Sequence, residues 1–152
     1  MTDANRRIGK FSLRQGLLLI FILGSAGLVA ELLLLEHFKE WRQQVPLALL
    51  GLGLILQAVH LVYKGPVVLR LFRLAMLAFV LVGIVGVWIH FDANLDFELE
   101  MYSKLSGWDL ISRSAHGALP VLAPGALIQL GLIGFLYTYR HPGLGAGQPE
   151  ME

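Results

Sequence analysis

Three histidines and one glutamate are the residues of this chain whose types and spacing point most directly to chemistry. His37, His90 and His116 each lie next to one end of a different apolar stretch, and Glu31 lies in the last turns of the first stretch. Imidazole nitrogens and carboxylate oxygens at one level of a helix bundle are typical ligands of a transition metal. The pattern therefore predicts a metal site made of His37, His90, His116 and Glu31, for zinc, copper or iron.

Other interpretations of the same residues stay open. An ionisable group inside a spanning segment is costly, so Glu31 is also a candidate titrating group of a small proton-coupled transporter. Alternatively, Glu31 reaches headgroup water or pairs with Arg113, and the histidines occupy the membrane interface without binding anything. A haem held between His37 and His90 is a variant of the metal site.

Other motifs are incomplete or missing. Asp92 to Asp96 is similar to the start of a calcium-binding loop, but Phe97 and Ser103 stand where that loop needs Gly and Glu. The sequence has no cysteine, which excludes disulfides, thiol catalysis and iron–sulfur clusters. It also has no nucleotide-binding loop, nucleophile elbow or metalloprotease motif, so no pattern predicts an enzyme.

The elements that would position these residues are apolar helices. The chain is 56% hydrophobic and 15% charged, whereas soluble domains average about 45–50% and about 25%. At about 20 residues per crossing, the sequence predicts an all-α, four-helix transmembrane bundle over residues 16–140. The predicted spans are residues 16–35, 45–63, 70–90 and 118–139.

A polar loop, residues 91–117, is predicted between the third and fourth spans. The alternation of apolar and acidic residues from Phe91 to Met101 favours a short extended segment or a cover at the interface. Residues 1–15 form a basic arm and residues 141–152 a disordered tail. A signal peptide cleaved near Gly27 is the alternative for the start of the chain, but apolar sequence continues well beyond Gly27.

Orientation follows from the placement of lysine and arginine. The N-terminal arm, the second link and the C-terminus hold Arg6, Arg7, Lys10, Arg14, Lys64, Arg70, Arg73 and Arg140. The other two links hold Lys39, Arg42, Lys104 and Arg113. Eight basic residues thus lie on the side of the two termini and four on the other side. This difference predicts that both termini lie inside and the acidic loop outside.

Small residues are expected at the helix contacts, because lipid removes the hydrophobic drive between spanning helices. The candidates are Gly24, Ala26, Gly27, Ala30, Gly51, Gly53, Gly83, Gly86, Ala126, Gly131 and Gly134.

The predicted function is that of a non-enzymatic membrane subunit or scaffold whose outer loop docks a protein partner. The net charge of +1 gives no basic patch for nucleic acid, so the expected partners are the lipid bilayer and another protein. In span number and loop length the chain resembles the small four-span proteins of bacterial inner membranes, which implies a multi-pass protein of the plasma membrane. A metal-handling or redox-linked protein and a transporter using Glu31 are the alternatives.

Overall fold

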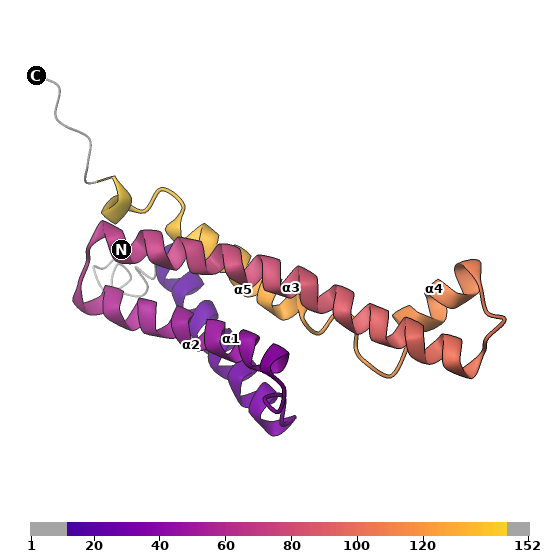
Figure 1. The fold of residues 1–152 in the computed structure, drawn as a ribbon. Helices are drawn as coiled ribbons and strands as arrows, with labels where there is room; N and C mark the ends of the chain where they lie inside the picture. The colour runs from indigo at the N-terminus through magenta and orange to yellow at the C-terminus, as the bar shows by residue number, and fades with distance from the viewer. Residues whose placement is uncertain (1–11, 146–152) are drawn as a thin grey trace, which may run out of the picture.

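The computed structural model describes residues 12–145, and its regular structure over that range is helical throughout (Figure 1). The elements are α1 (Leu13–Leu34), α2 (Trp41–Val62), α3 (Pro66–Met101), α4 (Gly107–Ala115), α5 (Gly125–Thr138) and the 3₁₀ turn η2 (Pro142–Leu144). The predicted all-α class is therefore confirmed for this part of the chain. Most of the predicted basic arm (residues 1–11) and of the predicted tail (residues 146–152) lies outside the described residues.

Three of the helices, α1, α2 and α3, are long and apolar enough to cross a membrane. The helix α5 is apolar but has 14 residues. The first helix is continuous through Ser25 and Gly27, where the alternative signal peptide would be cut, and it buries Ser25 completely.

Local sequence explains where the long helices begin. Ser12 and Gln15 form a reciprocal cap at α1, in which the Gln15 N–H donates to Ser12 Oγ at 3.2 Å and the Ser12 N–H to Gln15 Oε1 at 2.8 Å. Pro66 occupies the first turn of α3, where a missing N–H costs nothing. The cap of α1 satisfies backbone groups that lipid cannot.

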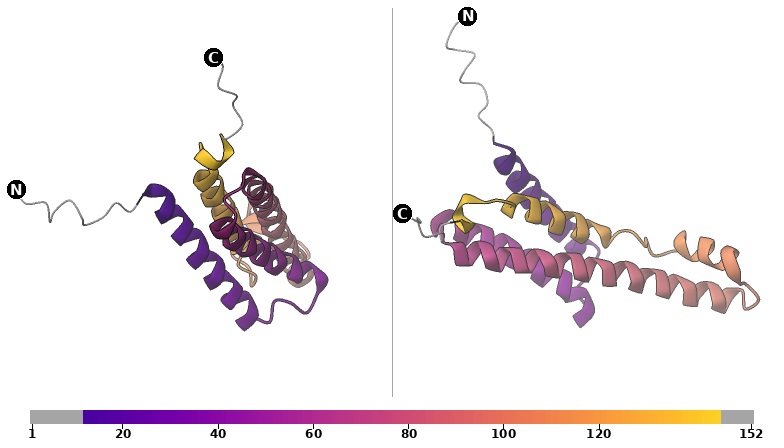
Figure 2. Two further views of the ribbon diagram at one scale, coloured as in Figure 1. Left: turned by 90° about the vertical axis from the view of Figure 1, so that its left-hand side faces the viewer. Right: turned by 90° about the horizontal axis from the view of Figure 1, so that it is seen from above.

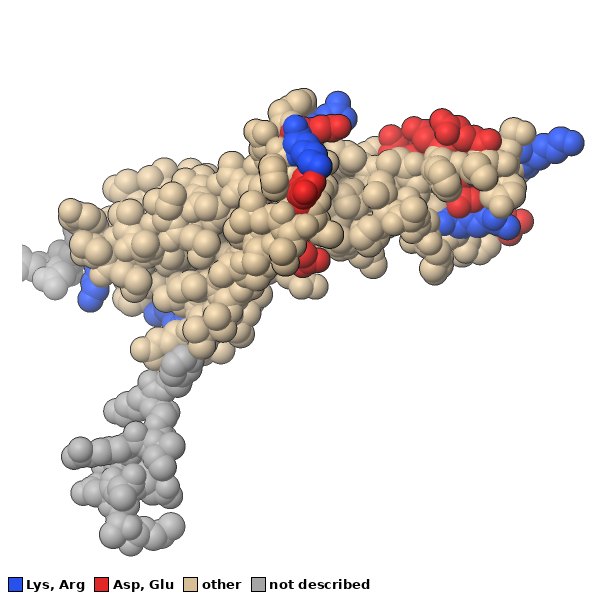
Figure 3. Space-filling model, turned by 90° about the horizontal axis from the view of Figure 1, so that it is seen from below, with Lys and Arg blue, Asp and Glu red and all other residues tan. Residues whose placement is uncertain are grey.

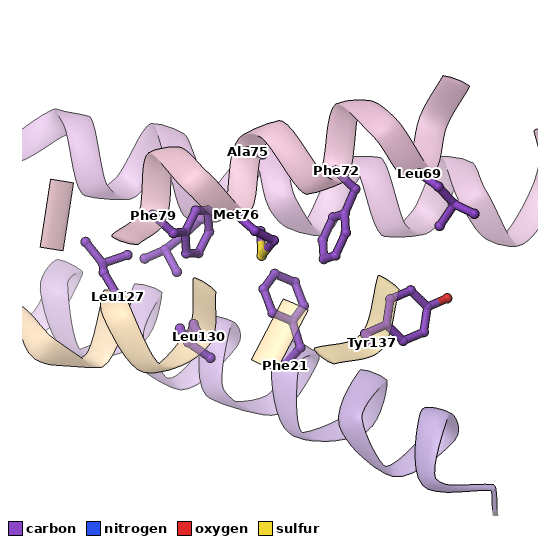
Figure 4. Packing of buried hydrophobic residues seen from close by; sticks show 10 residues of the cluster. Phe21, Leu69, Phe72, Ala75, Met76, Phe79, Leu127, Leu130 and Tyr137 are labelled. Carbon is purple, nitrogen blue, oxygen red and sulfur yellow. The ribbon is translucent and has the colours of Figure 1, made fainter. Parts of the chain in front are cut away.

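The core is a set of aromatic and aliphatic side chains between α1, α2, α3 and α5 (Figure 4). Phe21 of α1 lies edge-to-face against Phe72 of α3, with ring centroids 5.2 Å apart, and 6.0 Å from Phe79. Phe72 also contacts Tyr137 of α5 at 6.0 Å. These contacts between aromatic rings thus link α1, α3 and α5.

Glycines allow these helices to approach closely, as predicted. A Cβ atom on Gly131 would lie 2.8 Å from the Met76 carbonyl oxygen, and one on Gly83 would lie 3.0 Å from the Ile128 nitrogen. Close contacts are also made at Gly24, Gly53, Gly86 and Gly134. The prediction was wrong at Gly27 and Gly51, where an added Cβ would meet no atom within 4 Å.

The α1–α2 pair leans away from the long axis of α3 in both views (Figures 1 and 2). The start of α1, the α2–α3 turn and the end of α5 lie together at one end of the molecule, which we call the basic end because it carries Arg14, Lys64, Arg70, Arg73 and Arg140. At the opposite end, residues 91–101 of α3 and the antiparallel α4 form what we call the terminal hairpin.

The predicted loop over residues 91–117 is therefore wrong for most of its length. The third helix, predicted to end at residue 90, continues to Met101, and α4 follows after a five-residue turn, residues 102–106. Phe91, Leu95 and Leu99 are spaced by four residues and share the half-buried side of α3, whereas Phe97 and Met101 are exposed. A helical period had been interpreted as the two-residue period of a strand.

The fourth predicted helix, residues 118–139, is also too long. A helix from residue 118 would hold Pro124 in its interior, where proline lacks the N–H for the helical hydrogen bond and its ring clashes with the preceding turn. The helix begins at Gly125, directly after this proline. Residues 117–124 instead run as turns beside α3, where Gly86 makes room for Pro124.

Candidate functional site

The structure does not bring the four predicted metal ligands together. Glu31 is exposed on α1, and His37 lies in the α1–α2 turn, apart from the terminal hairpin that carries His90 and His116. Within residues 12–145, no three His, Asp or Glu side chains lie close enough to hold a metal ion. The suggested Glu31–Arg113 pair does not form either, since Arg113 lies 3.8 Å from Glu98.

Both hairpin histidines contact backbone carbonyls instead. The Nδ1 atom of His90 lies 3.1 Å from the Pro120 oxygen, and that of His116 lies 2.8 Å from the Ser112 oxygen. A carbonyl only accepts, so Nδ1 carries the hydrogen in each ring. His90 therefore ties α3 to the non-helical residues 117–124, and His116 ends α4.

Asn94 is the polar centre of the terminal hairpin. It is 2% exposed, and its amide donates to the Ser114 oxygen at 3.0 Å and to the Leu119 oxygen at 2.8 Å. Its Oδ1 accepts from the Leu119 N–H at 3.0 Å. Gly117 lies against the same amide, since a Cβ there would be 2.5 Å from Asn94 Cγ. One side chain thus satisfies backbone groups that would otherwise be buried without partners.

The exposed side of α3 changes from apolar to acidic along a single stripe. Ile84 and Trp88 are exposed on this stripe, and Asp92, Asp96 and Glu100 continue it at steps of four residues. Residues four apart lie on one side of a helix. The change between Trp88 and Asp92 is what a helix passing from lipid into water would show, with tryptophan at the interface.

The three carboxylates of this stripe have no ion-pair partner within residues 12–145; the hairpin's one ion pair there joins Arg113 to Glu98. Arg113 also lies over the ring of Tyr102, at 4.9 Å from its centroid. Acidic side chains gather at this end of the molecule, next to a few basic ones, and none is visible at the opposite end, where small basic patches show (Figure 3). The hairpin therefore offers unpaired negative charge on a rigid support.

At the basic end, the chain turns back after α5. Arg14 of α1 donates from Nη2 to the carbonyl oxygens of Arg140 at 2.9 Å and Tyr139 at 3.4 Å. His141 packs against His60, with ring centroids 5.4 Å apart. Burial lowers the pKa of His141 below its usual value, and the charge of Arg14 and the neighbouring His60 lower it further, so this ring is neutral at neutral pH.

Comparison of the chain with family models, with curated proteins and with solved structures gives no match.

Sequence reasoning missed two features of the site. The sequence indicated Asn94 only as part of an incomplete calcium loop. The pattern that could have indicated its structural role is a single amide side chain in an otherwise acidic helical segment. The contact of His60 with His141 was missed because His141 follows the last helix and only the turn through η2 brings it back.

Proposed function

We propose that this chain is a non-enzymatic membrane protein that docks a basic segment of a partner protein on its terminal hairpin. The observation that carries the proposal is the stripe on α3, which is apolar up to Trp88 and acidic from Asp92. At about 1.5 Å per residue, the 36-residue helix is about 54 Å long, and a bilayer core takes up only about 30 Å. Residues 92–101 would extend about 15 Å beyond it.

In this arrangement the chain crosses the membrane four times, with both termini inside and the hairpin outside. The helix α5 spans about 21 Å by itself, and residues 120–124, which lie beside α3 between His90 and Gly86, complete the crossing. His90 binds the Pro120 carbonyl there, and Asn94 binds the Leu119 backbone just outside the bilayer core. A bacterial inner membrane fits the proposed charge asymmetry.

Neither alternative function gains support from a specific contact. The four residues of the metal site lie apart, and Glu31 faces outward, away from the packed core. The terminal hairpin, by contrast, holds five acidic residues and two basic ones, Lys104 and Arg113, on a support fixed by a buried amide.

The orientation can be tested directly, because the sequence has no cysteine. Lys64→Cys and Asp96→Cys each introduce one thiol, at the basic end and on the hairpin. We expect a membrane-impermeant maleimide added to intact cells to label the cysteine at position 96 but not the one at position 64, which would react only after the cells are opened. Labelling of both or neither from outside would reject the proposed arrangement.

The docking proposal can be tested with a photo-crosslinking amino acid at Phe97, which is exposed beside the acidic stripe. We expect one discrete adduct in native membranes, with a lysine- and arginine-rich segment of a single protein. The same amino acid at Leu71, exposed on the apolar part of α3, is the matched control and should give no such adduct.

Reversing the stripe charge, with Asp92→Lys, Asp96→Lys and Glu100→Lys together, should lower the adduct yield by about tenfold or more, because like charges then face each other. The three side chains are exposed, so the helical circular dichroism should not change. Glu36→Lys, an exposed change in the α1–α2 turn apart from the terminal hairpin, is the control for charge alone. An adduct that survives the triple change would contradict the proposal.

A further inference from the structure

We propose that the basic end holds a binding site for a phosphoryl anion, in the hollow where the chain folds back from α5 onto α3. This inference concerns the opposite end from the terminal hairpin and does not depend on the proposed docking function.

The hollow has a volume of about 450 Å³. It is lined by Arg73 of α3 and, from the C-terminal turn, by Thr138, Tyr139, Arg140, His141 and Leu144 among others. Two arginines from separate elements, Arg73 and Arg140, therefore border one space, with the Arg140 guanidinium over the ring of Tyr139 at 5.4 Å from its centroid. Guanidinium groups bind phosphate oxygens with two parallel hydrogen bonds, which suits a phosphoryl group better than a halide.

Hydrogen bonds and apolar packing fix the turn that carries Arg140. The Gly143 N–H donates to His141 Nδ1 at 3.0 Å, and the His141 N–H donates to the Thr138 oxygen at 3.2 Å. Leu144 packs against the core. Arg140 itself has φ of 46°, a left-handed conformation that non-glycine residues keep only when their surroundings impose it. Its position beside the hollow is thus set by the fold.

Within residues 12–145, no acidic side chain lies at the basic end. Arg73 and Arg140 form no ion pair within residues 12–145, and Arg14 is bound to neutral carbonyl oxygens. All described acidic residues belong to the far part of α1, to the α1–α2 turn or to the terminal hairpin. A bound anion would therefore supply a negative charge that no other described residue places near these three arginines.

His141 adds a neutral donor. Because its Nδ1 accepts from Gly143, the hydrogen of the neutral ring lies on Nε2. An anion in the hollow would raise the pKa of this histidine, in opposition to Arg14 and burial.

The phosphoryl group has two possible sources, the headgroup of an anionic phospholipid and a free phosphate. In the proposed orientation the hollow lies at headgroup level on the inner side, beside the exposed ring of Tyr139. Arg73 and Arg140 would bind the phosphoryl group of either one.

The test uses the purified full chain in nanodiscs of phosphatidylcholine, with or without an equal amount of phosphatidylglycerol. Native mass spectrometry then gives the ratio of the two lipids that stay bound. We expect the wild type to retain phosphatidylglycerol preferentially, and Arg73→Gln with Arg140→Gln to reduce that preference by about tenfold per arginine. Arg70→Gln is the matched control, because Arg70 has the same charge one turn away on α3 and does not line the hollow.

Inorganic phosphate distinguishes the sources. Displacement of phosphatidylglycerol by phosphate, with a rise of Tm in pure phosphatidylcholine discs, would assign the site to a free phosphate; no displacement would assign it to the lipid. Absence of any preference in the wild type, or an equal loss in Arg70→Gln, would overturn the proposal. If the double variant does not fold, Arg140→Gln alone, an exposed change, decides the same question.

Discussion

Gly131→Val is expected to force α3 and α5 apart and to lower the free energy of unfolding by about 3 kcal/mol. The reason is that a Cβ at Gly131 would lie 2.8 Å from the Met76 carbonyl oxygen and from Val80 Cγ2. The first of these atoms is backbone, so it cannot turn away as a side chain can, and one whole helix must shift. Unfolding by detergent titration, followed by circular dichroism, would measure the loss.

Gly27→Val is the control for that experiment. Gly27 is also inside a long apolar helix, but an added Cβ there meets nothing within 4 Å. Valine at a free helical position differs from glycine by less than about 0.5 kcal/mol. Equal losses in the two variants would show that helix packing does not depend on the contact at Gly131.

Asn94→Leu is expected to release α4 and residues 117–121 from α3 while leaving the core intact. Leucine has about the same size but cannot bind the Ser114 oxygen or either backbone group of Leu119. Leaving such groups buried and unpaired costs about 1–3 kcal/mol each, so with three groups affected the hairpin should lose at least about 3 kcal/mol locally. Hydrogen exchange measured by mass spectrometry should show faster exchange in α4 and unchanged exchange in α5.

Two further variants separate the role of the Asn94 amide from general effects. Asp96→Leu changes an exposed residue of the same helix and should leave exchange in α4 unchanged. Gly117→Ala should reproduce the effect of Asn94→Leu, because its Cβ would lie 2.5 Å from Asn94 Cγ. Wild-type exchange in both Asn94→Leu and Gly117→Ala would show that the hairpin is held elsewhere.

The Asn94 and His90 contacts also explain why the fourth apolar stretch tolerates two prolines. A helix starting at residue 118 would hold Pro124 in its interior, and the observed helix begins after it, at Gly125. The carbonyl of Pro120 is bound by His90, and both backbone groups of Leu119 are bound by Asn94. His90, a predicted metal ligand, and Asn94, part of the incomplete calcium loop, thus both form hydrogen bonds with backbone groups.

Sequence patterns alone were enough for the class of the protein and for much of its packing. Long apolar stretches predict α1, α2 and the first part of α3, because a helix is the structure that satisfies its own backbone in lipid. Small residues predicted the contacts at Gly24, Gly53, Gly83, Gly86, Gly131 and Gly134. These properties depend on length and side-chain size, which are local.

Only the tertiary structure decided which polar groups meet. Three histidines at the ends of apolar stretches have no defined mutual distance until the helices are placed, and His37 lies in the turn of the α1–α2 pair, which leans away from α3. The apolar residues after Phe91 fit both the two-residue period of a strand and the period of a helix. Packing against α4 selects the helical period. Periodicity is a property of one segment, whereas a shared site depends on contacts between segments far apart in the chain.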